Sequence, residues 1–198
     1  TLICLCVVTR PMVSPHDDPI ELVTSRYEEW RAAFGRERER VVSALCRQDL
    51  ETAVCRIEHV GSTAVPGLAA KDIVDIDVVV EDEAVGVVSE AIVAELGGTR
   101  VENSGTWHPV FREEDGQRFN DHVFGRPDDG WRVSVATAAA LRARPALRAA
   151  YEQHKRATAS GTDDLGTYSR AKSDLVEQLL AAARNLDRSF DFEVPDEP

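Results

Sequence analysis

Residues 58–80 read EHVGSTAVPGLAAKDIVDIDVVV, which predicts a strand, a turn opening at Gly61 and Ser62, and a second, strongly apolar strand. Asp75 and Asp77 stand one residue apart in that second strand. Because residues i and i+2 of a strand point to the same face, the two carboxylates should lie side by side. Carboxylates are poor strand formers, so folding alone explains them badly. We predict that they bind a divalent metal ion, Mg²⁺ or Mn²⁺; the alternative is two solvated carboxylates on an exposed face.

The turn between the two strands predicts a phosphate site. Gly61 allows close approach, and the amides and hydroxyls of Ser62 and Thr63 can cradle an anion. Gly and Ser also favour a plain tight turn, but this one stands thirteen residues before Asp75, counted from Ser62. Lys71 either meets a phosphate or pairs with the neighbouring Asp72 at the surface.

The same residues resemble the signature of the GrpB family, also called UPF0157. Later segments resemble the family in the same order, so that the resemblance covers roughly residues 20–185: Asn120 with His122-Val123, Leu141-Arg142 before Pro145, Tyr151 with Lys155, and Tyr168 with Ala171-Lys172. The resemblance implies a nucleotidyltransferase-like fold. It implies the fold more firmly than any particular reaction.

Active nucleotidyltransferases commonly use a further acid on a neighbouring strand to hold the catalytic metal. The matching position here is His122, beside Asn120, whereas strand alternation points Asp121 the other way. His122 serves either as a metal ligand or general base, with an unperturbed pKa near ~6.5, or as a buried histidine with satisfied hydrogen bonds. Tyr168 and Lys172 are four residues apart on one helix face, where they can reach phosphate and base or sugar.

The predicted C-terminal helices contain further candidates. Tyr151 and Lys155 repeat the four-residue spacing, although a surface role is the simpler interpretation for each. Where family members often carry Phe-Arg-Asp-Tyr-Leu-Arg, residues 137–142 of this chain place Ala138 and Ala139 at the arginine and aspartate positions. This departure puts in question any substrate contact made there.

The hydrophobic pattern predicts one mixed α/β (α+β) domain over residues 20–186. A nucleotidyltransferase-like mixed sheet of three to five strands flanked by helices occupies residues 20–124, and a C-terminal helical half occupies residues 131–186. The site should lie between these halves. The expected helices are 26–47, with a capping box at Ser25, then 83–96, 133–143, 146–159 and 167–186; the expected strands are 53–60, 72–80, 99–103, 107–112 and 117–124.

The two ends of the chain are predicted to lie outside the domain. Residues 1–19 are interpreted as a disordered or upstream extension, because the resemblance starts after Met12, the only methionine and the expected natural start. The acidic tail, residues 187–198, is expected to fray.

Composition limits the function. A net charge of −12 argues against general nucleic-acid binding, which needs a basic surface. No apolar run approaches the length of a membrane span. The four cysteines form no C-x-x-C pair, which favours reduced thiols and a cytoplasmic location.

These observations lead to a first hypothesis, a Mg²⁺-dependent nucleotidyltransferase that moves a nucleotidyl group from an NTP, with ATP expected, to a small-molecule acceptor. The alternative is a non-catalytic nucleotide- or phosphate-binding module of the same fold, and a purely structural protein ranks last. Under the first hypothesis the catalytic residues are Asp75, Asp77 and His122, and the ligand-binding residues are Gly61, Ser62, Thr63, Lys71, Tyr168 and Lys172. The acceptor and the oligomeric state stay open.

Overall fold

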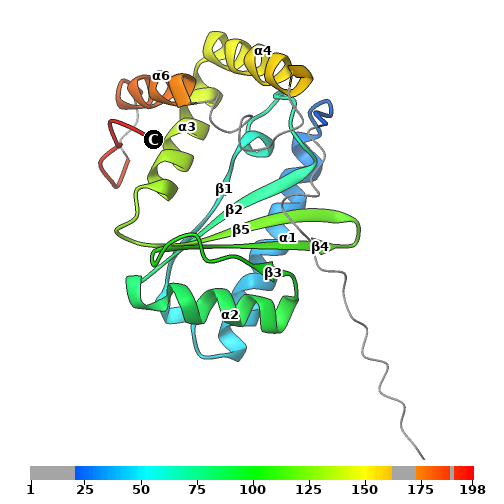
Figure 1. Cartoon of the computed structure of the whole chain (residues 1–198), viewed down its shortest axis with the longest axis vertical. Helices are drawn as coiled ribbons and strands as arrows, with labels where there is room; N and C mark the ends of the chain where they lie inside the picture. Colours follow the sequence, from blue (N-terminus) through cyan, green and yellow to red (C-terminus); the bar gives the residue numbers. More distant parts are fainter. Residues whose placement is uncertain (1–20, 162–172, 188–189) are drawn as a thin grey trace, which may run out of the picture.

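The computed structural model describes residues 21–161, 173–187 and 190–198, which form a mixed α/β fold (α+β) (Figure 1). Expectations for Met12, the segment 1–19, Tyr168 and Lys172 lie outside the described residues. Within the described ranges, no helix is long and apolar enough to cross a membrane. The helices and strands, in chain order, are α1 (Tyr27–Arg47), β1 (Val54–Val60), β2 (Ile73–Val80), α2 (Val85–Leu96), β3 (Thr99–Arg100), β4 (Trp107–Glu114), β5 (Gln117–Gly125), α3 (Gly130–Ala143), α4 (Pro145–Gly161) and α6 (Ser173–Arg184).

The sheet has the strand order β1-β2-β5-β4-β3. The pair β2 and β5 is parallel, and the other three neighbouring pairs are antiparallel. Asp75 therefore lies beside Asn120 of β5, and Asp77 lies between His122 of β5 and Glu58 of β1. Paired residues of neighbouring strands point to the same face, so this register gathers polar side chains from three strands.

The two faces of β2 differ as the alternation predicts. Val74, Ile76 and Val78 are fully buried in the main core, which α1 and α2 cover. Asp75 and Asp77 point to the opposite face, toward α3, because successive side chains of a strand alternate. The apolar run thus stabilises the sheet while leaving the two acids on the face opposite the main core.

Helix α1 packs on the first face through its aromatic and aliphatic stripe, which includes Trp30, Val41 and Leu45, all fully buried. The predicted capping box is wrong: the helix begins at Tyr27 with no side-chain cap. The hydroxyl of Ser25 is instead buried without a hydrogen-bond partner among the described residues. Core packing, rather than the cap, therefore fixes the start of this helix.

A charged triad lies buried beneath the sheet on the α1 side. Arg112 donates to Asp121 over 2.5 Å and to Glu37 of α1 over 2.6 Å. Burial opposes the charge on Arg112, but the two carboxylates raise its pKa above the ordinary value. Gly98 is needed beside it, because a Cβ there would lie 2.3 Å from the Arg112 side chain. Asp121 therefore points away from Asp75, as alternation predicts, and belongs to the core.

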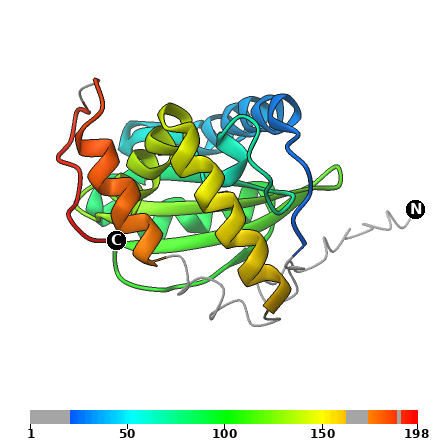
Figure 2. The same ribbon diagram turned by 90° about the horizontal axis from the view of Figure 1, so that it is seen from above.

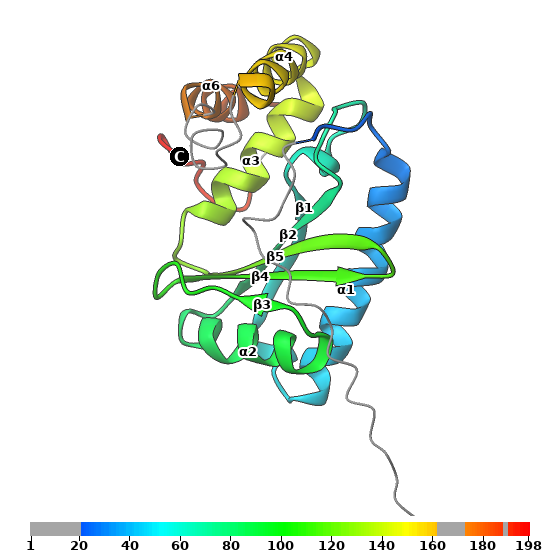
Figure 3. The same cartoon turned by 45° about the vertical axis from the view of Figure 1, so that its right-hand side comes forward.

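The helical half covers the turn that follows β1. Figure 2 looks down on this half and shows α4 and α6 above the strands; Figure 3 shows α3 rising from the sheet toward them. Val65 and Leu68 from the turn segment pack with Leu141 of α3 and with Leu179 and Leu180 of α6 in a second core. The turn segment is thus enclosed between the sheet and the helices.

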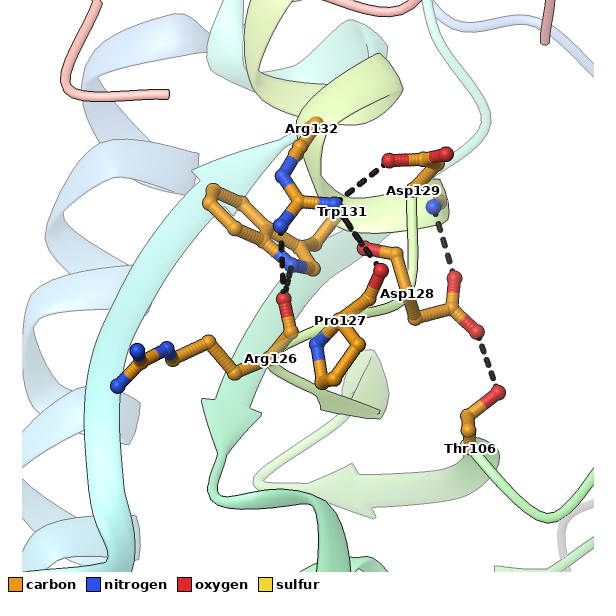
Figure 4. A network of polar contacts seen from close by, with 8 residues as sticks. Thr106, Arg126, Pro127, Asp128, Asp129, Trp131 and Arg132 are labelled. Carbon is orange, nitrogen blue, oxygen red and sulfur yellow. Dashed lines mark hydrogen bonds and ion pairs between the residues drawn. The ribbon is translucent and has the colours of Figure 1, made fainter. Parts of the chain in front are cut away.

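The loop that leads from β5 into α3 is held by the side chain of Arg132 (Figure 4). Its guanidinium donates to the carbonyl oxygens of Arg126 and Pro127 and pairs with Asp129 over 2.6 Å. Asp128 accepts from the Thr106 hydroxyl over 2.6 Å and from the first amide of α3 over 2.8 Å. These bonds fix the direction in which α3 leaves the sheet.

Residues 190–198 of the acidic tail contact the body of the domain. Asp191 pairs with Arg56 of β1 over 2.6 Å, and the ring of Phe192 lies 4.9 Å from that of Trp131. Arg184 donates to the carbonyl of Pro195 over 2.6 Å. The two phenylalanines of the tail supply apolar contact that the acidic composition conceals.

Candidate functional site

Asp75 and Asp77 lie in different environments. Asp77 is 0% exposed, and neither of its carboxylate oxygens has a hydrogen-bond partner among the described residues. Burial raises its pKa to about 8; the charges of Asp75 and Glu58 add to this effect, whereas the charge of His122 and the nearby Ser134 hydroxyl oppose it. The Asp75 side chain is 31% exposed. Burial opposes its charge as well, yet hydrogen bonds from His122 and Asn120 keep its pKa below the ordinary value.

The partners of Asp75 form a chain across two strands. Asn120 donates to Oδ1 of Asp75 over 3.1 Å, and Nε2 of His122 lies 3.8 Å from the same oxygen. The indole N–H of Trp107 donates to Nδ1 of His122 over 3.3 Å. Since that nitrogen accepts, the proton of the neutral ring sits on Nε2 and faces Asp75.

Nδ1 of His122 therefore has a hydrogen-bond partner, whereas Nε2 lies at ion-pair distance from Asp75. Burial opposes a positive charge on the ring, but the hydrogen bond to Asp75 and the charge of Asp77 raise its pKa. Protonation of His122 would place a proton on Nδ1, which could then no longer accept the hydrogen bond from the indole N–H of Trp107. The sequence leaves open whether His122 is a metal ligand or general base, or a buried histidine with satisfied hydrogen bonds; the structure places its ring between Trp107 and Asp75.

Gly61 lies directly against Asp75. Its φ is +67°, and a Cβ at this position would lie 2.3 Å from Oδ2 of Asp75. Only glycine combines that backbone conformation with so close an approach. The predicted phosphate turn and the predicted metal ligand are thus in contact.

Ser62 is held from the helical half. Nζ of Lys155 donates to the Ser62 hydroxyl over 2.7 Å and to the carbonyl of Ala69 over 2.9 Å. The amide of Ala69 in turn donates to Glu152 over 3.3 Å. Glu152 and Lys155 of α4 therefore hydrogen-bond to the turn segment at Ser62 and at Ala69.

Thr63 is buried and contacts a histidine of β1. It is 1% exposed, and its hydroxyl is 3.1 Å from Nε2 of His59. The ring of His59 stacks on Phe34 at 4.9 Å between centroids. Burial, followed by the charge of Arg142, lowers the pKa of His59 to about 4. Thr63 and His59 thus tie the turn to α1.

Lys71 stands close to the acids. Burial lowers its pKa, whereas the charge of Asp75 acts in the opposite direction. The surface pairing with Asp72 is not formed: that carboxylate bonds to Arg26 and to the indole N–H of Trp30, the latter over 2.9 Å. Lys71 is therefore placed within the electrostatic reach of the site.

Comparison with known proteins supports the family suggested by the motif. The model of the family described as GrpB protein matches residues 19–182. The chain belongs to the GrpB family. A UPF0157 protein of Streptomyces coelicolor is 36% identical to it over 183 residues, covering 89% of this chain and 91% of that protein. A UPF0157 protein of Halalkalibacterium halodurans is 33% identical over 180 residues, covering 89% and 88%.

A solved member of the GrpB family has the same fold. The crystal structure of conserved protein GrpB from Enterococcus faecalis superposes with a TM-score of 0.67 and covers 83% of this chain and 98% of that one. The sequence identity is 20%, so the likeness concerns the fold alone.

Three residues near the acids are not among the site residues that the sequence predicts. Glu58 lies opposite Asp77 in register, which the strand alternation shows only once the pairing is known. Trp107 has no local signal in the sequence, because its hydrogen bond to His122 joins β4 to the neighbouring strand β5. Lys155 carried a signal, its spacing from Tyr151, but its buried contact with Ser62 joins residues 93 apart in the chain.

Asp75 and Asp77 are the residues that could hold a magnesium ion, with water and phosphate oxygens as its further ligands. Asp77 offers two buried oxygens without partners, and Asp75 lies beside it on the same face. Among the residues the structure describes, no group of three or more His, Cys, Asp or Glu side chains is close enough to hold a metal ion. Mg²⁺ commonly uses one or two carboxylates and completes its shell with water and phosphate oxygens.

Proposed function

We propose that this GrpB family protein is a Mg²⁺- or Mn²⁺-dependent nucleotidyltransferase that uses an NTP, with ATP expected, and a small-molecule acceptor. The observation that carries the proposal is Asp77: a fully buried carboxylate without a partner among the described residues, next to the ligand-accessible Asp75. Burying an acid in this way is costly unless a cation joins it.

Under this proposal, each group of residues in the site has its own role. Asp75 and Asp77 hold the metal, and Asn120 and His122 orient Asp75. When bound, the metal neutralises the charge that develops on the phosphates during transfer. Gly61 and Ser62 bind the phosphate chain through a backbone amide and a hydroxyl. Lys71 adds positive charge, and Tyr168 and Lys172, which lie outside the described residues, would bind the ligand.

A second candidate is a nucleotide- or phosphate-binding module without turnover. The observation that favours it is the placement of His122, whose Nδ1 accepts from Trp107 and whose Nε2 faces Asp75 rather than a ligand. The described residues also offer no clustered third acid. Both candidates share the same ligand site and differ in the transfer step.

A thermal-shift series with ATP, GTP, CTP and UTP, each with and without Mg²⁺, tests the shared site. A ligand that binds only the native state raises Tm by mass action. We expect a Mg²⁺-dependent rise for wild type that Asp75→Asn with Asp77→Asn abolishes. Asp115→Asn, which removes an acid from the distant β4–β5 turn, should keep it. No shift with any nucleotide would overturn the proposal, and pyrophosphate release in an acceptor screen separates the enzyme from the module.

A further inference from the structure

We infer that Lys155 is a positioning residue whose buried charge makes the turn at Gly61 and Ser62 a site for a polyphosphate group. This inference rests on the proposed function, because it assigns the phosphate end of the same ligand. Lys155 comes from α4, whereas the metal-binding acids come from β2, so the two halves of the domain together would build the site.

Burial argues against an ordinary surface lysine. The Lys155 side chain is 3% exposed, although lysine is rarely buried without a specific reason. Its ammonium bonds to the Ser62 hydroxyl and the Ala69 carbonyl, both in the turn segment. A buried ammonium is costly, so this placement requires compensation from the groups around it.

The chemistry of the contact orients Ser62. An ammonium group only donates, so the Ser62 oxygen accepts from Lys155, and the Ser62 hydroxyl also contacts the phenol of Tyr151. A cation on the oxygen also polarises the hydroxyl and makes it a stronger donor. Tyr151 packs beside this pair, with its ring 5.6 Å from Nζ. Burial raises the pKa of Tyr151 to about 12, so it stays neutral and does not cancel the lysine charge.

The geometry fixes the charge relative to the acids. Glu152 and Lys155 hold the amide and the carbonyl of Ala69, respectively, so α4 cannot slide along the turn segment. At the other end of the segment Gly61 contacts Asp75. A cation that contacts Ser62 and Ala69 and a carboxylate that contacts Gly61 match a metal-bound polyphosphate, which is negative along its length and neutralised by metal at one end.

The experiment measures dissociation constants for Mg²⁺ with ATP, AMP and inorganic tripolyphosphate by calorimetry. Lys155→Gln keeps a hydrogen-bond donor under the turn but removes the charge, and Lys155→Arg keeps the charge. We expect Lys155→Gln to weaken ATP and tripolyphosphate binding about tenfold or more, because hydrogen bonds to charged groups are the stronger class. AMP binding should change less, and Lys155→Arg should recover part of the loss.

Two further variants isolate the contact. In a Ser62→Ala background, the effect of Lys155→Gln should shrink, because the lysine acts through that hydroxyl. Arg148→Gln removes a charge from the first turn of α4 and should bind as wild type does.

The outcomes separate the inference from the proposed function. If wild type binds Mg²⁺-ATP and Lys155→Gln binds it equally well, the inference is overturned and the proposed function stands. Equal losses in Lys155→Gln and Lys155→Arg would show that the side chain only packs the turn, which also overturns it. If wild type binds neither ATP nor tripolyphosphate, both are overturned.

Discussion

The backbone of Gly61 touches the carboxylate of Asp75: a Cβ on the glycine would lie 2.3 Å from Oδ2. The turn and the strand therefore define each other's position. A change at either residue should disturb both the phosphate site and the metal site, although the two belong to separate elements.

Gly61→Ala should destabilise the protein and abolish the Mg²⁺-dependent nucleotide shift, because the new methyl group displaces Asp75. Gly67→Ala is the matched control: its φ is +75°, but a Cβ there meets nothing within 4 Å. Backbone strain alone should cost Gly67→Ala about 1–2 kcal/mol and leave ligand binding intact. Urea unfolding and thermal shift check both variants. A Gly61→Ala protein that behaved like Gly67→Ala would contradict the contact.

Asp77→Asn should stabilise the metal-free protein at neutral pH. The folded-state pKa of Asp77, about 8, lies above the ordinary 3.8. Its contribution to stability is full below pH 4 and is lost as pH rises toward 8, because only the unfolded chain ionises in that range. Asn does not titrate, so unfolding in EDTA should show a gain on the order of 1–4 kcal/mol at pH 7. A loss of stability in Asp77→Asn at pH 7 would contradict the costly burial of the charged carboxylate. With added Mg²⁺, wild type should become the more stable of the two proteins.

His59 should give the opposite pH dependence. Its pKa falls from 6.5 to about 4 in the folded state. The stability that it contributes is complete above pH 6.5 and is lost as pH falls toward 4, since the unfolded chain takes up the proton first. His59→Gln should remove up to about 3 kcal/mol of acid sensitivity in this window. His154→Gln is the control. If His59→Gln lost as much stability as wild type between pH 6.5 and 4, His59 would not be the source of the acid sensitivity.

Trp107→Phe should weaken metal binding without changing a ligand. The indole N–H holds the proton of His122 on Nε2, facing Asp75. Removal of a group that orients a metal ligand typically costs about 10–100-fold in affinity, and we expect the lower end here. Titration with Mn²⁺ measures the affinity, and ¹⁵N spectra of the histidine ring report the tautomer.

Trp131→Phe is the control for that variant, because it removes an indole bond to the Arg126 carbonyl away from the acids. It should leave both the Mn²⁺ affinity and the His122 tautomer unchanged. Unchanged ¹⁵N shifts of His122 in Trp107→Phe would mean that the indole does not select the tautomer.

The sequence predicts those features that depend on local spacing. Alternation in β2 places Asp75 and Asp77 on one face, and the Asp115-Gly116 pair marks the β4–β5 hairpin, where both residues have positive φ. Such patterns are visible because neighbours in the chain share one strand or turn.

Features that depend on tertiary contacts escape the sequence. The register that sets Glu58 opposite Asp77 needs the strand pairing, and the Lys155–Ser62 bond needs the packing of α4. The charge of the tail does not indicate its packing, because Phe190 and Phe192 contact the buried clusters and the ring of Phe192 packs on that of Trp131. The departure at Ala138 and Ala139 is also a tertiary feature, because both residues are buried on α3.

The parallel pairing of β2 with β5 also bears on how the protein folds. Asp75 and Asn120 are 45 residues apart in the chain, whereas the β4–β5 hairpin closes over two. Local contacts form before distant ones because loop closure opposes the latter. The hairpin should therefore form early and dock onto β2 afterwards. Until β5 has left the ribosome, a growing chain carries both acids without their orienting partners, so the site is completed late in synthesis.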